Sequence, residues 1–425
     1  MKSISNISKG YKKTKVGIIP SEWEVTNLGS LVEIQSGNSP NMFDLENGGE
    51  IPYIKVDDLN NSSKYQNSSR YQTKLSKGVI PINSILFPKR GAAILNNKVR
   101  INKVPIQMDS NMMAIYPKTD KINYEYLYYK ITFQKLFRIA DTSTIPQINN
   151  KHILPYRISL PPLQEQHKIA EILSTWDKAI STQSQILIES LNRKKGLEQK
   201  ILSGKNRFQE FIKSHSLVKT PVGELPEDWE LQHISDITLR VKKSINPEPE
   251  TIYREIGIRS HCKGIFHKEE VTGASLGNKS VFWIQPDCFV VNIVFAWEHA
   301  IAKTTEAEVG MIASHRFPMY KPKKGVLDLD YLLYYFKTAR GKHLLGLASP
   351  GGAGRNKTLG QGEFAKLKIP VPSLAEQKRI VAVLSEADRE IELLKQQIAN
   401  LKEQKKGLMQ KLLTGEIRVK TNNKE

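Results

Sequence analysis

The fold of this chain follows from a stretch that occurs twice, as PPLQEQHKI at residues 161–169 and as PSLAEQKRI at residues 372–380. The two copies are 211 residues apart, and the same offset relates KKGL at residues 194–197 to KKGL at residues 405–408. A repeat at a fixed period indicates a duplicated structural unit. Because the offset stays constant along this segment, the segment itself carries no insertion or deletion.

A second repeat lies upstream of each copy of the first. Residues 13–24 read KTKVGIIPSEWE and residues 219–230 read KTPVGELPEDWE, an offset of 206 residues. The region between the two repeats is therefore longer in the second copy. The predicted order is globular domain, helix, globular domain, helix, with the boundaries 1–158, 159–206, 207–370 and 371–425.

Each helical segment begins after a proline-rich stop and continues without proline to Gly204 or Gly415. Apolar residues recur at alternating spacings of three and four, which is a heptad seam, and Lys194 and Lys405 fill the same seam position. A helix of about 40 residues is roughly 60 Å long. Since neither seam can stay exposed, we expect the two helices to pair antiparallel, with pseudo-two-fold symmetry. The alternative is that each helix packs on its own domain.

The two globular regions combine short strand-like runs with a later helix in each. Residues 51–56 and 253–258 are rich in β-branched and aromatic side chains, which favour strands. Residues 288–295 are also predicted to form a strand, and helices are predicted near residues 124–138 and 330–342. The expected fold class is α+β, with two tandem β-rich domains separated by two long antiparallel coiled-coil helices.

Composition limits the class of protein. The formal net charge is +20 and the sequence pI is about 9.6, which favours nucleic acid as a partner; solubility or an acidic protein partner are the alternatives. There is no run of 18 apolar residues and no apolar signal-peptide core, and the cysteines are only Cys262 and Cys288. These features predict a cytoplasmic protein without a membrane span.

The loops differ most between the two copies, and they contain side chains that can contact DNA. Arginine, lysine, asparagine and glutamine read base edges, while serine and threonine contact phosphates. One scaffold with divergent polar loops fits two domains that read different sequences, although for any single residue solvation is the alternative. The candidate DNA-binding residues are Lys89, Arg90, Asn97, Lys98, Arg100, Ser143, Thr144, Gln147, Lys242, Lys243, Trp297, His299, His315, Arg316, Arg355, Asn356 and Lys357.

The sequence contains no recognisable catalytic constellation. Residues 351–358 read GGAGRNKT, which is similar to a phosphate-binding loop, but Asn356 stands where that motif requires glycine. The two cysteines, together with His267 and His299, lack the paired spacing of a zinc site. We therefore expect no catalytic residue, no metal and no cofactor bound by this chain.

The repeated motifs resemble those of a known family. The most specific are Gly-x-x-Pro-x-x-Trp-Glu at the start of each half, Pro-x-Leu-x-Glu-Gln at each helix start, and Lys-Lys-Gly-Leu near each helix end. With this domain order, and with Asp177 and Asp388 in the helices, the whole chain resembles the specificity subunit of type I restriction–modification systems. Departures between the copies are small, such as Ser373 in the place of Pro162.

The resemblance implies that each globular region is a target recognition domain that reads one half of a bipartite DNA site. The paired helices would set the spacer and dock two methyltransferase subunits, which hold S-adenosylmethionine and methylate adenine. Motor-nuclease subunits using ATP and Mg²⁺ would join them for restriction, so catalysis and these cofactors belong to partner subunits. Some type II enzymes with separate specificity chains are similar, and the residues do not separate the two systems.

Two other functions fit parts of the sequence. An autonomous methyltransferase or nuclease is suggested only by the unassigned polar loops, and turnover by the chain alone would support it. A scaffold that binds acidic proteins through its helices is the third hypothesis. Its DNA binding would not depend on salt, whereas genuine phosphate binding weakens steeply as salt rises.

Overall fold

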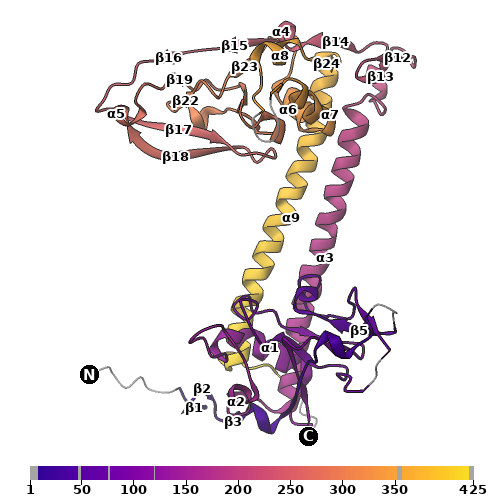
Figure 1. The fold of residues 1–425 in the computed structure, drawn as a ribbon, viewed down its shortest axis with the longest axis vertical. Helices are drawn as coiled ribbons and strands as arrows, with labels where there is room; N and C mark the ends of the chain where they lie inside the picture. Colours follow the sequence, from indigo (N-terminus) through magenta and orange to yellow (C-terminus); the bar gives the residue numbers. More distant parts are fainter. Residues whose placement is uncertain (1–7, 46–48, 75–76, 119, 352–356, 421–425) are drawn as a thin grey trace. The chain divides into compact units, whose positions relative to one another are not determined.

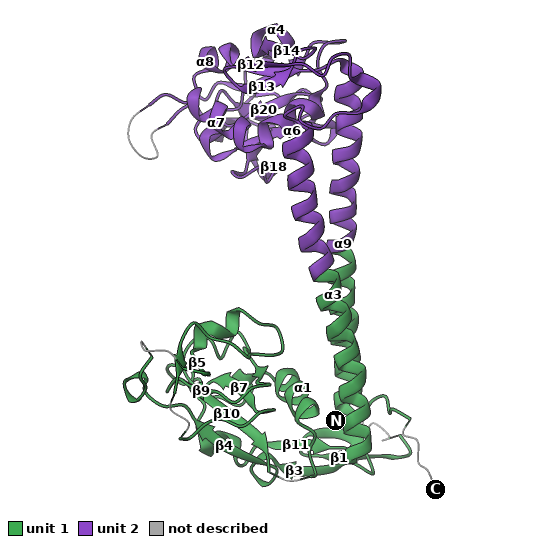
Figure 2. Ribbon diagram, turned by 90° about the vertical axis from the view of Figure 1, so that its right-hand side faces the viewer, with its two compact units in different colours: residues 1–184, 396–425 green, residues 185–395 purple. Residues whose placement is uncertain are grey.

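The computed structural model describes residues 8–45, 49–74, 77–118, 120–351 and 357–420. The chain is a mixed α+β protein that divides into two compact units, coloured separately in Figure 2. Unit 1 consists of residues 1–184 and 396–425, and unit 2 consists of residues 185–395. The expected α+β class, with β-rich domains and two long helices, is confirmed.

Two long helices contribute to both units. Helix α3 (Leu163–Ile201) and helix α9 (Leu374–Thr414) are each continuous in Figure 1. Unit 1 contains the N-terminal part of α3 and the C-terminal part of α9, and unit 2 contains the two remaining parts. The borders of the compact units therefore fall inside the helices, whereas the domain borders expected from the sequence lie just before α3, just after α3 and just before α9.

Unit 1 contains a four-stranded antiparallel sheet of order β4-β10-β7-β8 and a three-stranded sheet of order β6-β5-β9. A hairpin, β1-β2, and a strand pair, β3-β11, complete its β-structure in the described residues. Its strands are β1 (Tyr11–Thr14), β2 (Gly17–Pro20), β3 (Glu24–Asn27), β4 (Val32–Ser36), β5 (Ile51–Ile54), β6 (Gln72–Thr73), β7 (Ile85–Pro88), β8 (Arg100–Ile101), β9 (Gln107–Met108), β10 (Met112–Pro117) and β11 (Arg157–Leu160). Its shorter helices are α1 (Tyr124–Gln134) and α2 (Asn150–Ile153).

Strands β7 and β10 lie at the centre of the four-stranded sheet because they are apolar and buried along most of their length. Ile85 and Ile115 pair directly across them, and helix α1 packs its buried tyrosines into the same core. This core also includes Leu412 and Leu413 from the last turns of α9. The C-terminal part of α9 is therefore integral to the core of unit 1.

Unit 2 repeats this plan, but its second sheet has five strands. Its sheets have the orders β15-β23-β20-β21 and β16-β19-β22-β17-β18, and β12-β13 and β14-β24 are its hairpin and strand pair. Its strands are β12 (Leu217–Thr220), β13 (Gly223–Pro226), β14 (Glu230–His233), β15 (Thr238–Val241), β16 (Ser244–Ile245), β17 (Ile252–Ile258), β18 (Ile265–Thr272), β19 (Val281–Trp283), β20 (Phe289–Val291), β21 (Ile301–Lys303), β22 (Ile312–Ser314), β23 (Met319–Pro322) and β24 (Lys368–Val371). Its shorter helices are α4 (Ile234–Ile237), α5 (Gly273–Leu276), α6 (Leu329–Lys337), α7 (Ala339–Leu347) and α8 (Gln361–Lys366).

The helix expected near residues 330–342 is in fact two helices. Thr338 has an extended backbone, with φ −71° and ψ 164°, and its side chain accepts a hydrogen bond from the Gly341 N–H. A threonine in this conformation is a typical N-cap, so it ends α6 and begins α7. The helix expected near residues 124–138 ends earlier as α1, because Lys135 adopts φ 65°.

The strand expected at residues 288–295 is shorter than predicted. Strand β20 ends at Val291, since the backbone beyond it bonds to other segments of unit 2. The Ile293 N–H donates to the Arg316 carbonyl at 3.0 Å, and the Ile293 carbonyl accepts from the Leu359 N–H at 2.8 Å. The apolar residues that follow Val291 therefore form a loop held by backbone hydrogen bonds and are not part of the sheet.

The Gly-x-x-Pro-x-x-Trp motif has the same role in both units. In unit 1 the Trp23 indole donates to Glu165 at 2.9 Å, and in unit 2 the Trp229 indole donates to Glu376 at 3.1 Å. Each glutamate stands in the first turn of a long helix. The motif therefore fastens the start of each half to the start of the helix that follows it.

An arginine completes each of these contacts from the end of the other helix. In unit 1 the Arg418 Nε donates to Glu165 at 2.7 Å, and in unit 2 the Arg207 Nε donates to Glu376 at 2.8 Å. These hydrogen bonds raise the pKa of both guanidinium groups. Arg418 follows α9 and binds the start of α3, whereas Arg207 follows α3 and binds the start of α9. In each unit, the residues after one long helix therefore contact the first turn of the other.

The long helices pair antiparallel within each unit, as expected. In unit 1 the Lys405 Nζ lies 2.5 Å from the Asp177 Oδ1, and in unit 2 the Lys194 Nζ lies 2.7 Å from the Asp388 Oδ1. A tyrosine hydroxyl donates to the same aspartate in each case, Tyr129 to Asp177 and Tyr334 to Asp388. Each seam lysine therefore bridges the two helices and, through the aspartate, reaches a tyrosine of its own unit.

Candidate nucleic-acid interface

Three backbone segments of unit 1 meet at the end of strand β7. The Lys89 N–H donates to the Asn111 carbonyl and the Lys89 carbonyl accepts from the Ile148 N–H, both at 2.8 Å. Arg90 and Gln147 form a β-bridge beside them. Loops distant in sequence, including residues expected to bind DNA, are thereby fixed side by side.

The loop that carries Ser143 and Thr144 is closed by its own hydrogen bonds. Asp141 and Gln147 exchange both backbone hydrogen bonds at 2.9 Å, and the Asp141 carboxylate accepts from the Ser143 N–H and hydroxyl. These bonds from Ser143 lower the pKa of Asp141. Ser143 and Thr144 are exposed, so a fixed loop presents hydroxyl groups next to Arg90.

Lys89 and Arg90 give this surface its charge. Arg90 is exposed, while Lys89 is partly covered, and burial together with the neighbouring Arg90 lowers the pKa of Lys89. Two adjacent cations of which one is partly desolvated interact strongly with an anion that reaches them. The segment is thus suited to a negatively charged ligand.

Unit 2 has a corresponding surface at the end of strand β20. Here Ile293 takes the central position, because its backbone is hydrogen-bonded to Arg316 on one side and to Leu359 on the other. The Trp297 indole donates to the Val294 carbonyl at 3.1 Å, and the Lys357 Nζ lies 6.0 Å from the Trp297 ring centroid. The structure therefore brings together Trp297, Arg316 and Lys357.

Further candidates in unit 2 gather around strand β19. The Lys243 carbonyl accepts from the Trp283 N–H, and the Lys242 Nζ lies 5.4 Å from the Phe282 ring centroid. At the other end of β19 the His315 N–H donates to the Ser280 carbonyl at 3.2 Å. Lys242, Lys243 and His315 are exposed, and His315 precedes Arg316, so this group continues into the surface around Ile293.

Two candidate side chains are hydrogen-bonded within the protein, and a third is partly buried. The Asn97 amide donates to the Thr132 carbonyl and accepts from the Leu136 N–H, and it therefore fixes the end of helix α1. The Arg100 guanidinium donates to the Leu59 and Val99 carbonyls. His299 is partly buried, has φ 63°, and burial lowers its pKa to about 4. These residues support the loops from inside.

The remaining candidates divide between exposed and undescribed positions. Lys98 is partly exposed beside Asn97. Arg355 and Asn356 lie outside the described residues. Asn111 was not among the residues predicted from the sequence. It lies two residues after Asp109, which follows strand β9, and its carbonyl is at the centre of the unit 1 surface. A loop at residues 61–74, rich in serine, asparagine and cations, was also missed, although its composition is typical of nucleic-acid contacts.

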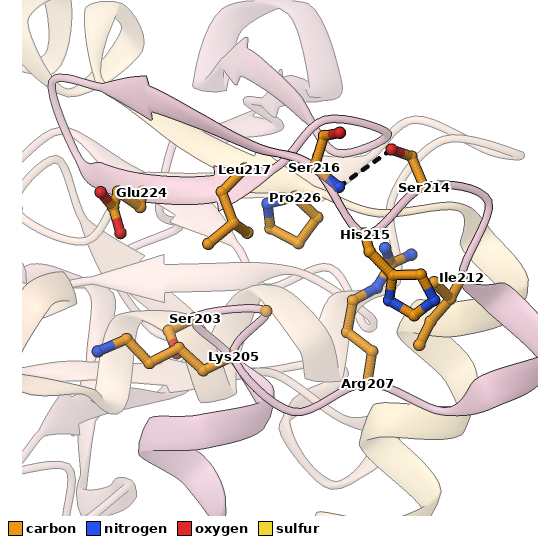
Figure 3. A pocket seen from close by; sticks show the side chains of 11 residues that line it. Ser203, Lys205, Arg207, Ile212, Ser214, His215, Ser216, Leu217, Glu224 and Pro226 are labelled. Atoms are coloured by element: carbon orange, nitrogen blue, oxygen red, sulfur yellow. Dashed lines mark hydrogen bonds between the residues drawn. The ribbon is translucent and has the colours of Figure 1, made fainter.

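The hollow drawn in Figure 3 lies on the segment that follows helix α3 in unit 2 and has a volume of about 410 Å³. Arg207 is one of its lining residues, but its guanidinium is occupied by Glu376 and Asp228. The Ser216 N–H donates to the Ser214 hydroxyl at its rim (Figure 3). The hollow therefore borders the contact that closes unit 2 and belongs to its framework.

Two features are absent from the residues that the structure describes. Among those residues no group of three or more histidine, cysteine, aspartate or glutamate side chains is placed to hold a metal ion. In the same part of the chain no helix combines the length and apolar character needed to cross a bilayer.

A profile of the family described as "Type I restriction modification DNA specificity domain" matches residues 20–190 and 282–403, more than half of the chain. The chain belongs to this DNA specificity family. The type I restriction enzyme MjaVIII specificity subunit of Methanocaldococcus jannaschii is 26% identical to this specificity chain, with 95% of each covered. The MjaIX specificity subunit of the same organism is 30% identical over 265 residues, 58% of each chain.

A solved structure of similar fold is the S subunit of a type I restriction–modification system from M. genitalium. Its TM-score is 0.55 and its sequence identity 14%, over 92% of this specificity chain and 96% of that one. The likeness shows that the fold is shared. The family membership expected from the repeated motifs is confirmed, and the specificity chain is a DNA-recognition component rather than a catalytic subunit.

Proposed function

We propose that the globular domains at residues 1–158 and 207–370 each read one half of a bipartite duplex DNA site. The observation that carries this proposal is the equivalent surface in the two units, where the loops after β7 and β20 meet the same two neighbouring segments. One scaffold with different side chains at the same place is what two domains with different base preferences require.

In unit 1 the proposed contacts come from Arg90 and Gln147 to base edges and from Lys89, Ser143 and Thr144 to phosphates. In unit 2 they come from Arg316 and Lys357, with Lys242, Lys243 and His315 beside them. Arginine binds guanine bidentately and glutamine binds adenine, while lysine and hydroxyl groups contact the backbone. Trp297 supports Lys357 through a cation–π contact.

The helical segments at residues 159–206 and 371–425 set the spacing between the half-sites and dock two methyltransferase subunits in this proposal. S-adenosylmethionine would be held by those subunits, and ATP and Mg²⁺ by motor-nuclease subunits that join the complex in the cytoplasm. The chain's own part would be to select the DNA. In this proposal the two equivalent ion pairs, Asp177 with Lys405 and Asp388 with Lys194, keep the helices in one register.

The test is methylome sequencing of cells that carry this chain with its methyltransferase, compared with cells that lack only this chain. A bipartite methyladenine motif that disappears with the chain is the expected result. Arg90→Ala should then relax the motif in one half-site, and Arg316→Ala in the other. If no motif depends on the chain and the purified complex binds all duplexes equally, the proposal is wrong.

A further inference from the structure

Two cations of unit 1 contact one aromatic ring outside the loops around Lys89 and Arg90. The Lys55 Nζ lies 3.8 Å from the centroid of the Tyr71 ring, and the Arg70 Cζ lies 5.1 Å from it. Such distances are typical of cation–π contacts. Both cations therefore lie against Tyr71, where strand β5 ends and strand β6 begins.

Neither cation has an acidic partner among the residues that the structure describes. Arg70 is exposed and Lys55 is partly exposed, and no ion pair in that part of the chain involves either side chain. Because both cations lie at the same ring, an anion that reaches Tyr71 meets two positive charges that no carboxylate neutralises. The pair is thus an unneutralised cationic site.

The site is held in place by a buried carboxylate. One oxygen of Asp58, a residue 5% exposed, accepts from the Lys55 N–H at 2.8 Å and from the Ser69 hydroxyl at 2.9 Å. The Ser69 hydroxyl oxygen in turn accepts from the Tyr71 N–H at 3.1 Å. Because Asp58 is used for these backbone and hydroxyl contacts, it orients the two cations without neutralising them directly.

A chain of hydrogen bonds connects this site to the surface around Lys89. The Ile54 carbonyl, next to Lys55, accepts from the Asp109 N–H at 2.9 Å. The Asp109 carboxylate accepts from the Asn111 N–H at 2.8 Å, and the Asn111 carbonyl accepts from the Lys89 N–H. The backbones that carry the two cationic groups are therefore connected by three hydrogen bonds.

In the corresponding strands of unit 2 the cations have acidic partners. Strands β17 and β18 pair as β5 and β6 do, and β17 runs parallel to β22 as β5 does to β9. Arg254 is paired with Glu270 at 2.7 Å and Lys268 with Glu255 at 3.4 Å. Arg259, which follows β17, lies over the Phe266 ring, so unit 2 places one cation on a ring there and unit 1 places two.

We propose that Lys55, Arg70 and Tyr71 form a binding site for backbone phosphate of duplex DNA beside the half-site read by the first recognition domain. Guanidinium matches the oxygens of a phosphate bidentately, and the lysine adds a point charge. The site supplies affinity that does not depend on base sequence. The proposal rests on the proposed function, because the duplex must already be bound to the first recognition domain.

The test uses the full chain in complex with its methyltransferase and two duplexes of about 40 base pairs. One contains the sequence motif that the complex methylates, and in the other this motif is scrambled. Dissociation constants are measured by fluorescence anisotropy from 50 to 300 mM KCl. For the double variant Lys55→Gln/Arg70→Gln we expect the slope of log affinity against log salt to fall by about 2, since each lost phosphate contact removes roughly 0.9. Both duplexes should weaken by the same factor.

The matched control is Lys13→Gln/Arg157→Gln, which removes the same charge from exposed positions on strands β1 and β11 of unit 1. An equal fall in slope for this control would assign the effect to net charge and overturn the site, and so would an unchanged slope for Lys55→Gln/Arg70→Gln. A loss confined to the motif duplex would show base reading and would also overturn it. If the unaltered complex does not distinguish the two duplexes, the proposed function fails instead.

A second measurement locates the contact on the DNA. Single methylphosphonate linkages, which remove one backbone charge each, are placed in turn along the motif duplex. We expect one or two positions at which the neutral linkage weakens binding of the unaltered complex and has no further effect on the Lys55→Gln/Arg70→Gln complex. If every position affects both complexes equally, the two cations contact no phosphate.

Discussion

A buried amine in unit 1 belongs to Lys130, on helix α1. Its side chain is 3% exposed, and its Nζ donates to the Ser159 hydroxyl at 2.6 Å and to the Leu413 carbonyl at 2.8 Å. Burial lowers its pKa from the ordinary 10.5 to about 7. The contact with Leu413 places this amine at the C-terminal end of α9, where a cation is favoured by the helix dipole.

Lys130 should make the stability of unit 1 depend on pH. Its pKa is lower in the folded than in the unfolded chain, so between about pH 7 and 10.5 the unfolded chain holds the proton that the folded chain has released. The free energy of unfolding should therefore rise with pH in this window, by up to about 1.4 kcal/mol per pH unit. Urea unfolding of the unaltered chain and of Lys130→Met at pH 7, 8 and 9 measures this, and a difference between them that stays constant would contradict it.

Glycine is required where helix α3 ends. Gly204 has φ +72°, and a Cβ atom there would lie 2.5 Å from Pro226. Gly325, with φ +82°, has no neighbour within 4 Å of such an atom. Both alanine variants lose the glycine's freedom in the left-handed region, but only Gly204→Ala also clashes. We expect Gly204→Ala to lower the free energy of unfolding by about 2 kcal/mol more than Gly325→Ala; equal losses in denaturant titrations would count against this.

At the scale of elements, the long helices were predictable and their polar contacts were only partly so. The heptad pattern and the prolines fixed where α3 and α9 begin, and the repeated lysine pointed to a seam position. The sequence could not show that Lys405 meets both Asp177 and, through it, Tyr129, because these partners come from three distant segments. It also could not show the break at Thr338, since a threonine is compatible with either a helix interior or a cap.

The polar contact in the seam should contribute measurably to the pairing of the helices in unit 1. Asp177 and Lys405 are largely covered, with side chains 27% and 15% exposed, so removing the lysine leaves a carboxylate without its cation. We expect Lys405→Met to lower the free energy of unfolding by roughly 1–3 kcal/mol. The matched variant Lys168→Met removes an exposed partner of Glu171 and should cost less than about 0.5 kcal/mol.

A double-mutant cycle separates the ion pair from the loss of the lysine stem. Asp177→Asn and Lys405→Met are combined, and the coupling energy is taken from unfolding titrations. A coupling near zero would mean that the lysine acts through packing alone.

At the scale of the whole molecule, the family and the α+β plan could be predicted because the chain is duplicated and its motifs are specific. The candidate DNA-binding surface stays a prediction, and the structure separates its residues. Arg90 and Gln147, chosen by residue type, lie side by side in the proposed surface, whereas Asn97 and Arg100 have the same chemistry and yet support the fold. Residue type does not reveal which way a loop side chain points, so the three-dimensional contacts were needed to separate these groups.

Residues 396–425 end the chain but belong to unit 1, the unit that contains the N-terminal domain. Their contribution to that unit can be tested by removing them. Leu412 and Leu413 belong to the core of unit 1, so the deletion should unfold the N-terminal domain although that domain lies far away in sequence. Hydrogen–deuterium exchange should show lost protection in α1 and β11 and retained protection in α6. Leu412→Asp in the full chain should weaken the same elements. Retained protection in α1 after the deletion would contradict this.

The division of the units also sets an order of events during synthesis. Residues 396–425 leave the ribosome only after all of residues 185–395, which make up unit 2. Unit 2 can therefore complete its core while the chain is still being made, whereas unit 1, whose first strands emerge much earlier, must wait for the end of α9. A chain whose translation stops early would hold a finished second domain and an unfinished first one, so it could not read both half-sites.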